Sequence, residues 1–475
     1  MRERSLGRSH SGRAGLMLVS LAAFPLIGIG QHSEQDIPSA DSLRGTSHLY
    51  DIMKQGELDG RFRLYNMATI NEGAPTDYHA VAFGGTLGFT SQRWHGTRFK
   101  LSGGYTFDLA TSDLTLADPV TGVTNRYEIG LFDVNDPRHT NDLAYLHEFQ
   151  LDWLSKSLRT QVIFGKQELN TPFLNPQDGR MHPSLFEGIW ANHRTKRGMA
   201  LQGGWIHRVA PRGASEWYTV AESMSVFPAG RNIYGEAARH GEHGSSTGIF
   251  IASLKKELYR STTITAWNLH TENVFNSALI QLDAGGKEDR WSVSTISIRQ
   301  DAAQYRGEGN DALQYVPHGV SSWAFSGRVR NVLGKFRWQL NYTRITAHGR
   351  YLMPREWGRD PFFTFLPRER NEGAGDVHAA SLNLIWKAKS GWRIQVDGGL
   401  YRMPELIDVR LNKYALPSYT QFDVNAQYQF RGGWRGLAAQ LLVVGKLPLD
   451  PGLTEKQSIN KVDMLHADLI INYVF

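Results

Sequence analysis

The sequence predicts an all-β fold: a single transmembrane antiparallel β-barrel of about 18 strands, with short periplasmic turns and long extracellular loops. Two patterns predict it. Apolar and polar residues alternate through most of the chain, and short polar links take turns with long irregular ones. The composition agrees, with 13 Trp, 18 Tyr and 22 Phe in 475 residues but a mean hydropathy of −0.38. A bundle of transmembrane helices is excluded, because each helix needs about 20 consecutive apolar residues.

The N-terminus, residues 1–30, is predicted to be a signal peptide. Four arginines precede an apolar stretch, GLMLVSLAAFPLIGIG, that ends in small residues. An uncleaved anchor is the alternative, but roughly 14 apolar residues are short for a membrane span. Residues 31–56 are then expected to form an N-terminal periplasmic segment and residues 57–475 the barrel.

The net charge gives no sign of a nucleic-acid partner. The chain carries a formal +6, but residues 1–30 hold four Arg and one Glu (4 − 1 = +3), so the remainder keeps +3 (6 − 3). Such a small excess does not support binding to a phosphate backbone. There is no Cys, so the exported protein does not depend on disulfides.

Alternation marks the individual strands. Apolar residues occupy every second position in segments 99–109, 143–153, 392–400, 422–430 and 464–475. In a strand, these residues point to one face and their polar neighbours to the other. A β-sandwich alternates in the same way, so the period does not decide the fold and the connections do.

The connections between the strands separate by length. Eight short polar links are predicted, at 91–97, 155–157, 194–197, 255–260, 284–289, 333–335, 388–391 and 431–436. Between them lie long irregular connections, among them 110–141, 209–245, 300–319, 347–376, 403–419 and 447–463. Transmembrane barrels show this asymmetry, and bacterial ones have an even number of strands. Residues 216–227 are therefore left in a loop, because counting them as a strand makes the total odd.

Tryptophans gather in or beside the short links, as in the aromatic girdle at a membrane interface. They are Trp94, Trp153, Trp291, Trp386, Trp392 and Trp434. A chance scatter of core aromatics is the alternative.

The chain ends on MLHADLIINYVF, residues 464–475, a strand with a complete apolar face. We expect it to pair with the first strand, near 57–68, and so to close the barrel. An open edge in lipid would leave backbone groups without hydrogen bonds, which costs several kcal/mol for each group.

The polar face of the strands is predicted to line a lumen. Its basic residues are Arg61, Arg63, Lys100, Arg159, Arg328, Arg330, Arg337 and Arg393. Arginines inside an aqueous channel guide anions or carboxylates through successive weak contacts. Asp108, Glu148 and Asp397 share that face, so ion pairing that only stiffens the wall stays open as the alternative.

Residues 164–190, FGKQELNTPFLNPQDGRMHPSLFEGIW, are the most distinctive segment. Their Pro, Asn, Asp and Gly content predicts an irregular loop, 167–186. Bulky residues such as Phe173, Leu174 and Met181 predict that this loop folds inward to cover them and narrows the pore.

Within this segment, GKQELNTPFLNPQDGRMHPSLFEG resembles the third loop of OprD-type porins. GRYLMPREWGRDPFF (349–363), in the long loop 347–376, resembles their seventh loop. The resemblance extends over the mature chain and implies a substrate-specific outer-membrane channel for amino acids, small carboxylates or, in some branches, chitooligosaccharides. It also implies a basic ladder and a constriction. The ladder candidates are Arg61, Arg63, Arg159, Arg328, Arg330, Arg337 and Arg393, and the constriction candidates are Asp178, Arg180 and Glu187.

Enzymatic motifs are set aside. GSSTG (244–248) fits G-x-S-x-G but lacks the following helix that a nucleophile elbow needs. HGEH (240–243) holds metal-ligating residue types in a polar loop, where they are more often solvated. We expect no cofactor, no metal and no catalysis. A barrel lipase with His147 on the lipid face is the enzymatic alternative, and an alginate-type export channel is another transport alternative.

The expected partners are small solutes, outer-membrane lipid and the barrel-assembly machinery, which reads the C-terminal strand in proteins of this class. The expected location is the bacterial outer membrane. The sequence leaves open which solute is carried and whether the protein is a monomer or a homotrimer.

Overall fold

The computed structural model describes residues 54–136, 143–177, 179–259, 261–285, 290–303, 310–368 and 370–475. The predicted signal peptide and nearly all of the predicted periplasmic segment lie outside these residues. Among the described residues, no helix has the length and apolarity of a membrane span.

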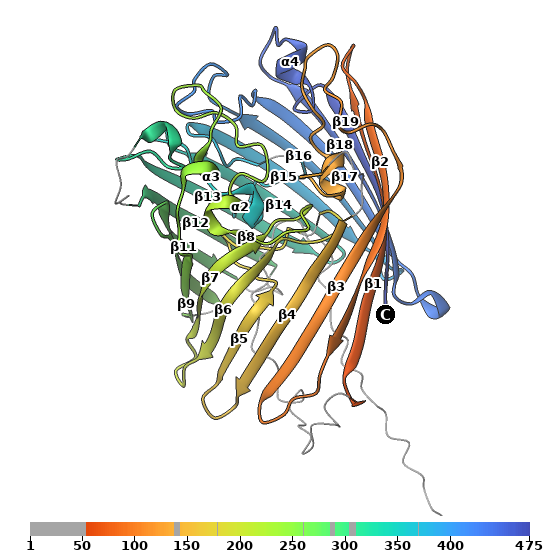
Figure 1. Cartoon of the computed structure of the whole chain (residues 1–475), viewed down its shortest axis with the longest axis vertical. Helices are drawn as coiled ribbons and strands as arrows, with labels where there is room; N and C mark the ends of the chain where they lie inside the picture. Colours follow the sequence, from red (N-terminus) through yellow and green to blue (C-terminus); the bar gives the residue numbers. More distant parts are fainter. Residues whose placement is uncertain are drawn as a thin grey trace, which may run out of the picture.

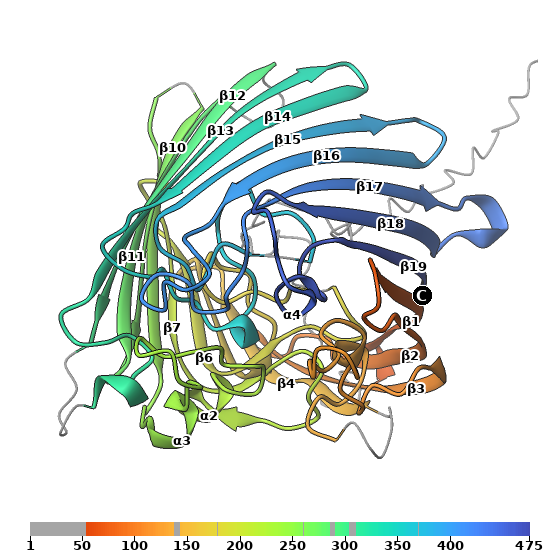
Figure 2. The same ribbon diagram turned by 90° about the horizontal axis from the view of Figure 1, so that it is seen from above.

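The described chain forms one closed antiparallel β-barrel of 18 strands with almost no helix, as predicted (Figure 1, Figure 2). A further two-residue strand, β8, lies outside the wall, because β7 pairs directly with β9. The strands are β1 (Glu57–Asn71), β2 (Tyr78–Thr90), β3 (Thr97–Thr111), β4 (Leu143–Ser155), β5 (Thr160–Gln167), β6 (Leu185–Arg194), β7 (Ala200–Ala210), β8 (Tyr218–Thr219), β9 (Ile249–Glu257), β10 (Thr262–Thr271), β11 (Phe275–Ala284), β12 (Trp291–Ala302), β13 (Ser321–Leu333), β14 (Phe336–Ile345), β15 (Val377–Lys387), β16 (Trp392–Arg402), β17 (Tyr419–Gln429), β18 (Leu437–Pro448) and β19 (Met464–Val474).

The helices are single turns in the connections. They are η2 (Glu128–Leu131), α2 (Val220–Ser223), α3 (His240–His243), η3 (Asp311–Leu313), η4 (Arg355–Trp357), η5 (Gly432–Trp434) and α4 (Glu455–Ser458). Segment 216–227 holds β8 and α2 and contributes no strand to the wall, as predicted.

The last strand closes the barrel on the first, as predicted. β1 pairs with β19 from Arg61, opposite Val474, to Asn71, opposite Met464. Beyond this ladder, the backbones of Gly60 and Phe475 exchange two hydrogen bonds, of 3.2 and 3.1 Å. No edge strand is left open at this seam, so its backbone groups are satisfied without water.

Toward the short turns, apolar side chains point outward and polar side chains point inward, whereas toward the long loops the inner face also carries buried apolar residues such as Ile251 and Tyr419. Phe422, Trp392, Tyr473 and Phe475 expose 58%, 43%, 42% and 50% of their surface. Asp423, which follows Phe422, is completely buried on the inner face. The predicted alternation is therefore confirmed, and the outer face has the apolar character that lipid requires.

Each of the eight predicted short links joins two neighbouring strands at one end of the barrel (Figure 1). Five of the tryptophans near these turns are exposed: Trp94, Trp153, Trp291, Trp392 and Trp434. At the other end, connections 72–77 and 272–274 are short as well, so the expected strict alternation of short and long links is wrong there. Asn273, at φ 60°, adopts the left-handed conformation that allows such a tight turn.

A β-bulge in β4 reverses the faces of that strand at His147. The pairing of β3 with β4 shifts between Ser102 and Gly103, and His147 is the extra residue. Its Nε2 lies 2.7 Å from Oε1 of Glu168, inside the barrel. The expectation that His147 faces lipid is therefore wrong, and the lipase alternative loses the residue that motivated it.

A charge on the outer face should destabilise the barrel. Leu441 in β18 exposes 47% of its surface. We expect Leu441→Arg to lower the free energy of unfolding by about 2–4 kcal/mol, because the guanidinium loses its hydration in lipid. Urea unfolding of protein refolded into lipid vesicles measures the change. The control Gln440→Arg puts the same charge on the adjacent inner-face position, and equal losses in both variants would contradict the assignment of faces.

Candidate functional site

A cavity of about 2680 Å³ occupies the interior of the barrel. The inner faces of several strands line it, mainly β1, β3, β4 and β17 to β19. Connections that reach into it are loop 2 (112–142), loop 3 (168–184), loop 4 (211–248), loop 7 (346–376) and loop 8 (403–418). Figure 2 shows such connections lying inside the ring of strands.

Loop 3 crosses the lumen because it joins two apolar clusters. Leu169, Phe173 and Leu174 are buried in the larger cluster, and Met181 is buried in the smaller one, beside Tyr65 of β1. Burial of each such side chain stabilises this path by about 1.5–3 kcal/mol. The apolar residues that predicted an inward loop are therefore the ones that hold it there.

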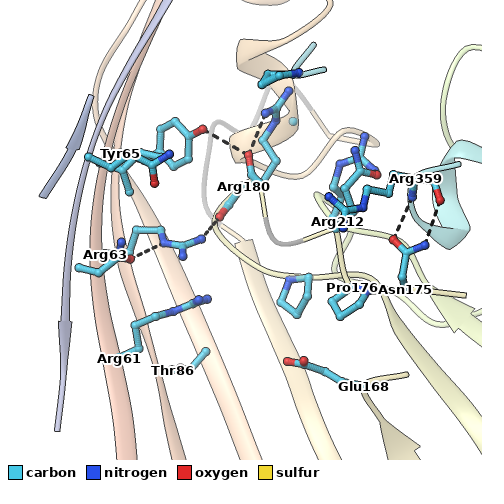
Figure 3. Close-up of a pocket in the computed structure, with 18 of the residues that line it drawn as sticks. Arg61, Arg63, Tyr65, Thr86, Glu168, Asn175, Pro176, Arg180, Arg212 and Arg359 are labelled. Atoms are coloured by element: carbon cyan, nitrogen blue, oxygen red, sulfur yellow. Dashed lines mark hydrogen bonds between the residues drawn. The ribbon is translucent and has the colours of Figure 1, made fainter. Parts of the chain in front are cut away.

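The far part of loop 3 is hydrogen-bonded to β1 (Figure 3). Three inner-face side chains of β1 donate to three successive carbonyls of the loop. The bonds run from Arg61 Nη2 to the carbonyl of Met181 (3.3 Å), from Arg63 Nη1 to the carbonyl of Arg180, and from Tyr65 Oη to the carbonyl of Gly179 (3.3 Å).

Loop 7 packs against the near part of loop 3 through Asn175. The backbone N of Asn175 donates to the carbonyl of Trp357 (3.0 Å), and its Nδ2 donates to the carbonyl of Arg359 (2.9 Å). Its Oδ1 accepts from the backbone N of Arg359 (3.0 Å). A Cβ on Gly358 would lie 2.4 Å from Oδ1 of Asn175, so this close approach requires glycine. Loops 3 and 7 thus form one hydrogen-bonded unit inside the barrel.

Basic side chains dominate the described lining of the cavity. They are Arg61, Arg63, Arg98, Lys100, Arg126, Arg180, Arg212, Arg231, Arg355, Arg359, Arg368, Arg370, Lys413, Arg431, Arg435 and Lys461. The acidic lining residues of the same described part are Asp59, Glu148, Asp152 and Glu168.

Three buried acids of loop 7 lie behind this lining. Asp360 Oδ2 accepts from the backbone N of Asn371 (2.9 Å), and Glu356 Oε1 accepts from the backbone N of Phe227 (2.9 Å). Glu372 forms an ion pair with Arg355. None of the three acids lines the cavity. The loops therefore present guanidinium groups to the lumen and keep these carboxylates in their own core.

Burial shifts the pKa of each of these loop groups in the direction that favours its neutral form. Desolvation lowers the pKa of Arg180 to about 10 and that of Lys413 to about 8, and it raises the pKa of Asp360 to about 6. Desolvation, followed by the charge of Arg370, also lowers the pKa of Arg212. Neighbouring arginines contribute to these shifts, since Arg368 lowers the pKa of Arg180 and Arg370 lowers that of Arg212. An anion that enters this region stabilises them.

The structure separates the predicted ladder residues into groups. Arg61, Arg63 and the constriction candidate Arg180 line the cavity. Arg328, Arg330, Arg337 and Arg393 stand on β13, β14 and β16, away from this cavity. Their hydrogen bonds include those from Arg328 to Ser294 Oγ (3.1 Å), from Arg330 to Ser292 Oγ (2.8 Å), and from Arg393 to Gln395 Oε1 (2.5 Å) and Gln427 Oε1 (3.3 Å).

Two other candidates lie elsewhere than expected. Arg159 is exposed in the turn between β4 and β5, at φ 51°, so its placement on the lumen wall is wrong. Glu187 in β6 forms an ion pair with Lys166 (3.3 Å) and does not line the cavity. Asp178 lies outside the described residues.

The arginines of loops 4 and 7 were missed from the sequence. Those that line the cavity are Arg212, Arg231, Arg355, Arg359, Arg368 and Arg370. A signal was available, because residues 355–370 contain four arginines next to bulky residues that favour an inward loop. The polar face of the strands was searched for charge, whereas these residues stand on connections.

The motifs set aside as catalytic have structural places. GSSTG leads directly into strand β9, not into a helix. HGEH forms α3, where His240 is buried with Nε2 2.9 Å from the carbonyl of Met224. Over the described ranges, no three His, Cys, Asp or Glu residues are grouped closely enough to hold a metal ion.

The model of the family described as "outer membrane porin, OprD family" matches residues 126–317, which include loop 3. No curated relative matches the chain. Solved structures with the same fold include Pseudomonas aeruginosa OccK9 (OpdG), at 15% identity and a TM-score of 0.68 over 89% of this chain and 99% of that one.

Two further structures hold carboxylates. Pseudomonas aeruginosa OpdK with vanillate has 15% identity and a TM-score of 0.65. Pseudomonas aeruginosa OccK2 (OpdF) in complex with glucuronate has 11% identity and a TM-score of 0.66. Each match covers 89% of this chain and 99% of the other. The match over residues 126–317 and the shared barrel fold make this chain similar to outer-membrane porins of the OprD type. They confirm the resemblance to the OprD family.

The preference of the pore for anions over cations should rise as the pH falls through about 6, which is the pKa of Asp360. Above this pH the carboxylate is charged and partly offsets the neighbouring Arg359 and Arg370, and below it the offset is lost. The reversal potential in a KCl gradient, measured at about pH 7.5 and about pH 5, checks this. Asp360→Asn should reduce the pH dependence. Retention of the whole shift in that variant would assign it to another group.

Proposed function

We propose that this protein is an outer-membrane porin for the selective passive diffusion of small hydrophilic solutes that carry a carboxylate, such as amino acids and organic acids. The observation that carries the proposal is the charge asymmetry of the constriction. Guanidinium groups of loops 3, 4 and 7 line the cavity, while Glu356, Asp360 and Glu372 are buried behind them.

Arginine suits this task because its planar guanidinium binds a carboxylate through two parallel hydrogen bonds. Figure 3 shows Arg61 and Arg63 on one side of the cavity and Arg212 and Arg359 on the other, with Arg180 on loop 3 between them. A carboxylate solute that moves through the pore leaves one guanidinium group as it binds the next. Several contacts of moderate strength allow both entry and release.

The arginines on β13, β14 and β16 extend this route along the wall in our proposal. Arg328, Arg330, Arg337 and Arg393 stand on inner faces, and three of them bond neutral hydroxyl or amide groups. The vanillate and glucuronate in the OpdK and OccK2 structures support a carboxylate as the common feature of the solute.

Export of an anionic polysaccharide would also use a basic lumen. Two observations favour small solutes: loop 3 is bonded to β1 across the lumen, and loop 7 is bonded to loop 3. A polysaccharide chain could pass through the lumen only if these hydrogen bonds between the loops and the wall opened. Channels for neutral oligosaccharides have no use for the concentration of guanidinium groups.

The C-terminal strand fits recognition by the barrel-assembly machinery. Phe475 is exposed on the outer face, with its ring centroid 5.6 Å from that of Phe62 and 6.0 Å from that of Tyr473. We include the assembly machinery and outer-membrane lipid as partners on this basis.

Removal of one guanidinium should weaken solute binding in the pore. We expect Arg359→Gln to raise the half-saturating concentration of a carboxylate solute on the order of 10- to 100-fold, since a charge-assisted hydrogen bond contributes about 1.5–3 kcal/mol. Swelling of liposomes that contain the refolded protein measures uptake of amino acids, organic acids and neutral sugars of equal size.

The control is Arg159→Gln, which removes the same charge from an exposed turn. Equal effects of the two variants would refute a role of the constriction arginines and leave the porin intact. Absence of any discrete conductance in planar bilayers, at any salt concentration, would refute the porin itself.

A further inference from the structure

We propose that Arg61, Arg63 and Tyr65 form a latch that fastens loop 3 across the lumen and so sets the aperture and selectivity of the pore. They act as positioning residues because each donates a hydrogen bond to a carbonyl of loop 3. The conductance test of this β1 latch rests on the proposed channel function. The placement of loop 3 can be tested without that function.

The three latch residues are spaced along β1 so that each one reaches one carbonyl of loop 3. Every second residue of β1 faces inward, which places the three side chains in one row. They meet three consecutive carbonyls of loop 3 in reverse order, from residue 181 back to residue 179. A single contact of this kind would be unremarkable, but three in register fix the position and the direction of the loop.

The seam of the barrel holds the latch in place. Arg63 Nε donates to Oδ1 of Asn472 (2.7 Å), its direct partner across the pairing of β1 with β19. Arg368 of loop 7 donates to Tyr65 Oη (3.2 Å) and is paired with Asp468 of β19. The closing strands therefore orient the donors, and loop 7 is attached at the same point.

Loop 3 needs directional bonds here. The buried side chain of Met181 holds this part of the loop near β1, but apolar packing has no preferred direction. Gly179 has no side chain, and apart from its chain neighbours the nearest atom to a Cβ built on it is 3.8 Å away, so no side-chain packing holds it against β1. Hydrogen bonds to the carbonyls therefore decide how far the loop extends into the lumen.

Arg180 gains its place from the same contacts. Its carbonyl accepts from Arg63, and its side chain, which lines the cavity, donates from Nη1 to the carbonyl of Gly179 (2.8 Å; Figure 3). Release of the latch would move this guanidinium relative to Arg212 and Arg359. The aperture and the spacing of the guanidinium groups thus depend on how β1 holds loop 3.

The test uses variants that leave the charge of the pore unchanged. Tyr65→Phe removes one latch bond, and Asn472→Ala removes the group that orients Arg63. We expect the double variant to show higher unitary conductance in planar bilayers and to lose discrimination between carboxylates and neutral solutes of equal size, with the sign of the reversal potential retained. Wild-type conductance and wild-type discrimination in this variant would overturn the proposal.

Arg393→Gln serves as the matched control. It removes an inner-face charge from β16, where the described bonds of Arg393 go to Gln395 and Gln427 and not to loop 3. We expect it to shift the reversal potential without a rise in conductance. A rise equal to that of the double variant would assign the effect to general loosening of the wall and refute the latch.

Cross-linking tests the placement of loop 3 directly. The chain contains no Cys, so Tyr65→Cys combined with Gly179→Cys introduces a unique pair. A short bis-thiosulfonate reagent should bridge the pair within one chain, and the bridge should lower the conductance of the double-cysteine protein until it is reduced. Failure to cross-link, in protein whose heat-modifiable gel mobility shows a folded barrel, would refute the latch. Absence of conductance with efficient cross-linking would instead refute the channel function.

Discussion

The need to satisfy every backbone hydrogen bond in lipid governs this structure. Where β1 meets β19, the ladder from Arg61 to Asn71 removes the edges that an open sheet would expose. Closure divides the residues into an outer set that contacts lipid and an inner set that does not. The features of the interior, from the buried arginines to the inward loops, are consequences of that division.

A barrel of this size has an interior too wide for wall side chains to fill. Loops 3 and 7 occupy it and bring their own apolar cores, so that Phe173 and Trp357 are as well buried as residues of a soluble domain. Packing of this kind holds irregular backbone inside a membrane protein, where it is tolerated only if it is enclosed by protein or lines water. Loops 3 and 7 thus form a small folded unit inside the barrel.

Charge is distributed through this unit according to the cost of burial. Carboxylates such as Asp360 are buried with backbone donors, and guanidinium groups such as that of Arg359 reach the cavity. A buried carboxylate is tolerable when backbone N–H groups serve it, whereas Arg has a long stem that can extend its charged end toward water. The lumen becomes basic even though acids and bases are interspersed along loop 7.

The sequence by itself determined the barrel, its strand number, the closing pair and the inward path of loop 3, because side-chain alternation and loop length are local properties that lipid and backbone hydrogen bonding translate directly into structure. Tertiary structure decided which charges share a site. The bulge at His147 reversed a face that strict alternation assigns to lipid, and a turn removed Arg159 from the wall. Arg180, Arg212 and Arg359 are distant in sequence and meet only because three loops fold into one lumen. Their meeting depends on packing across the barrel, which no local pattern encodes.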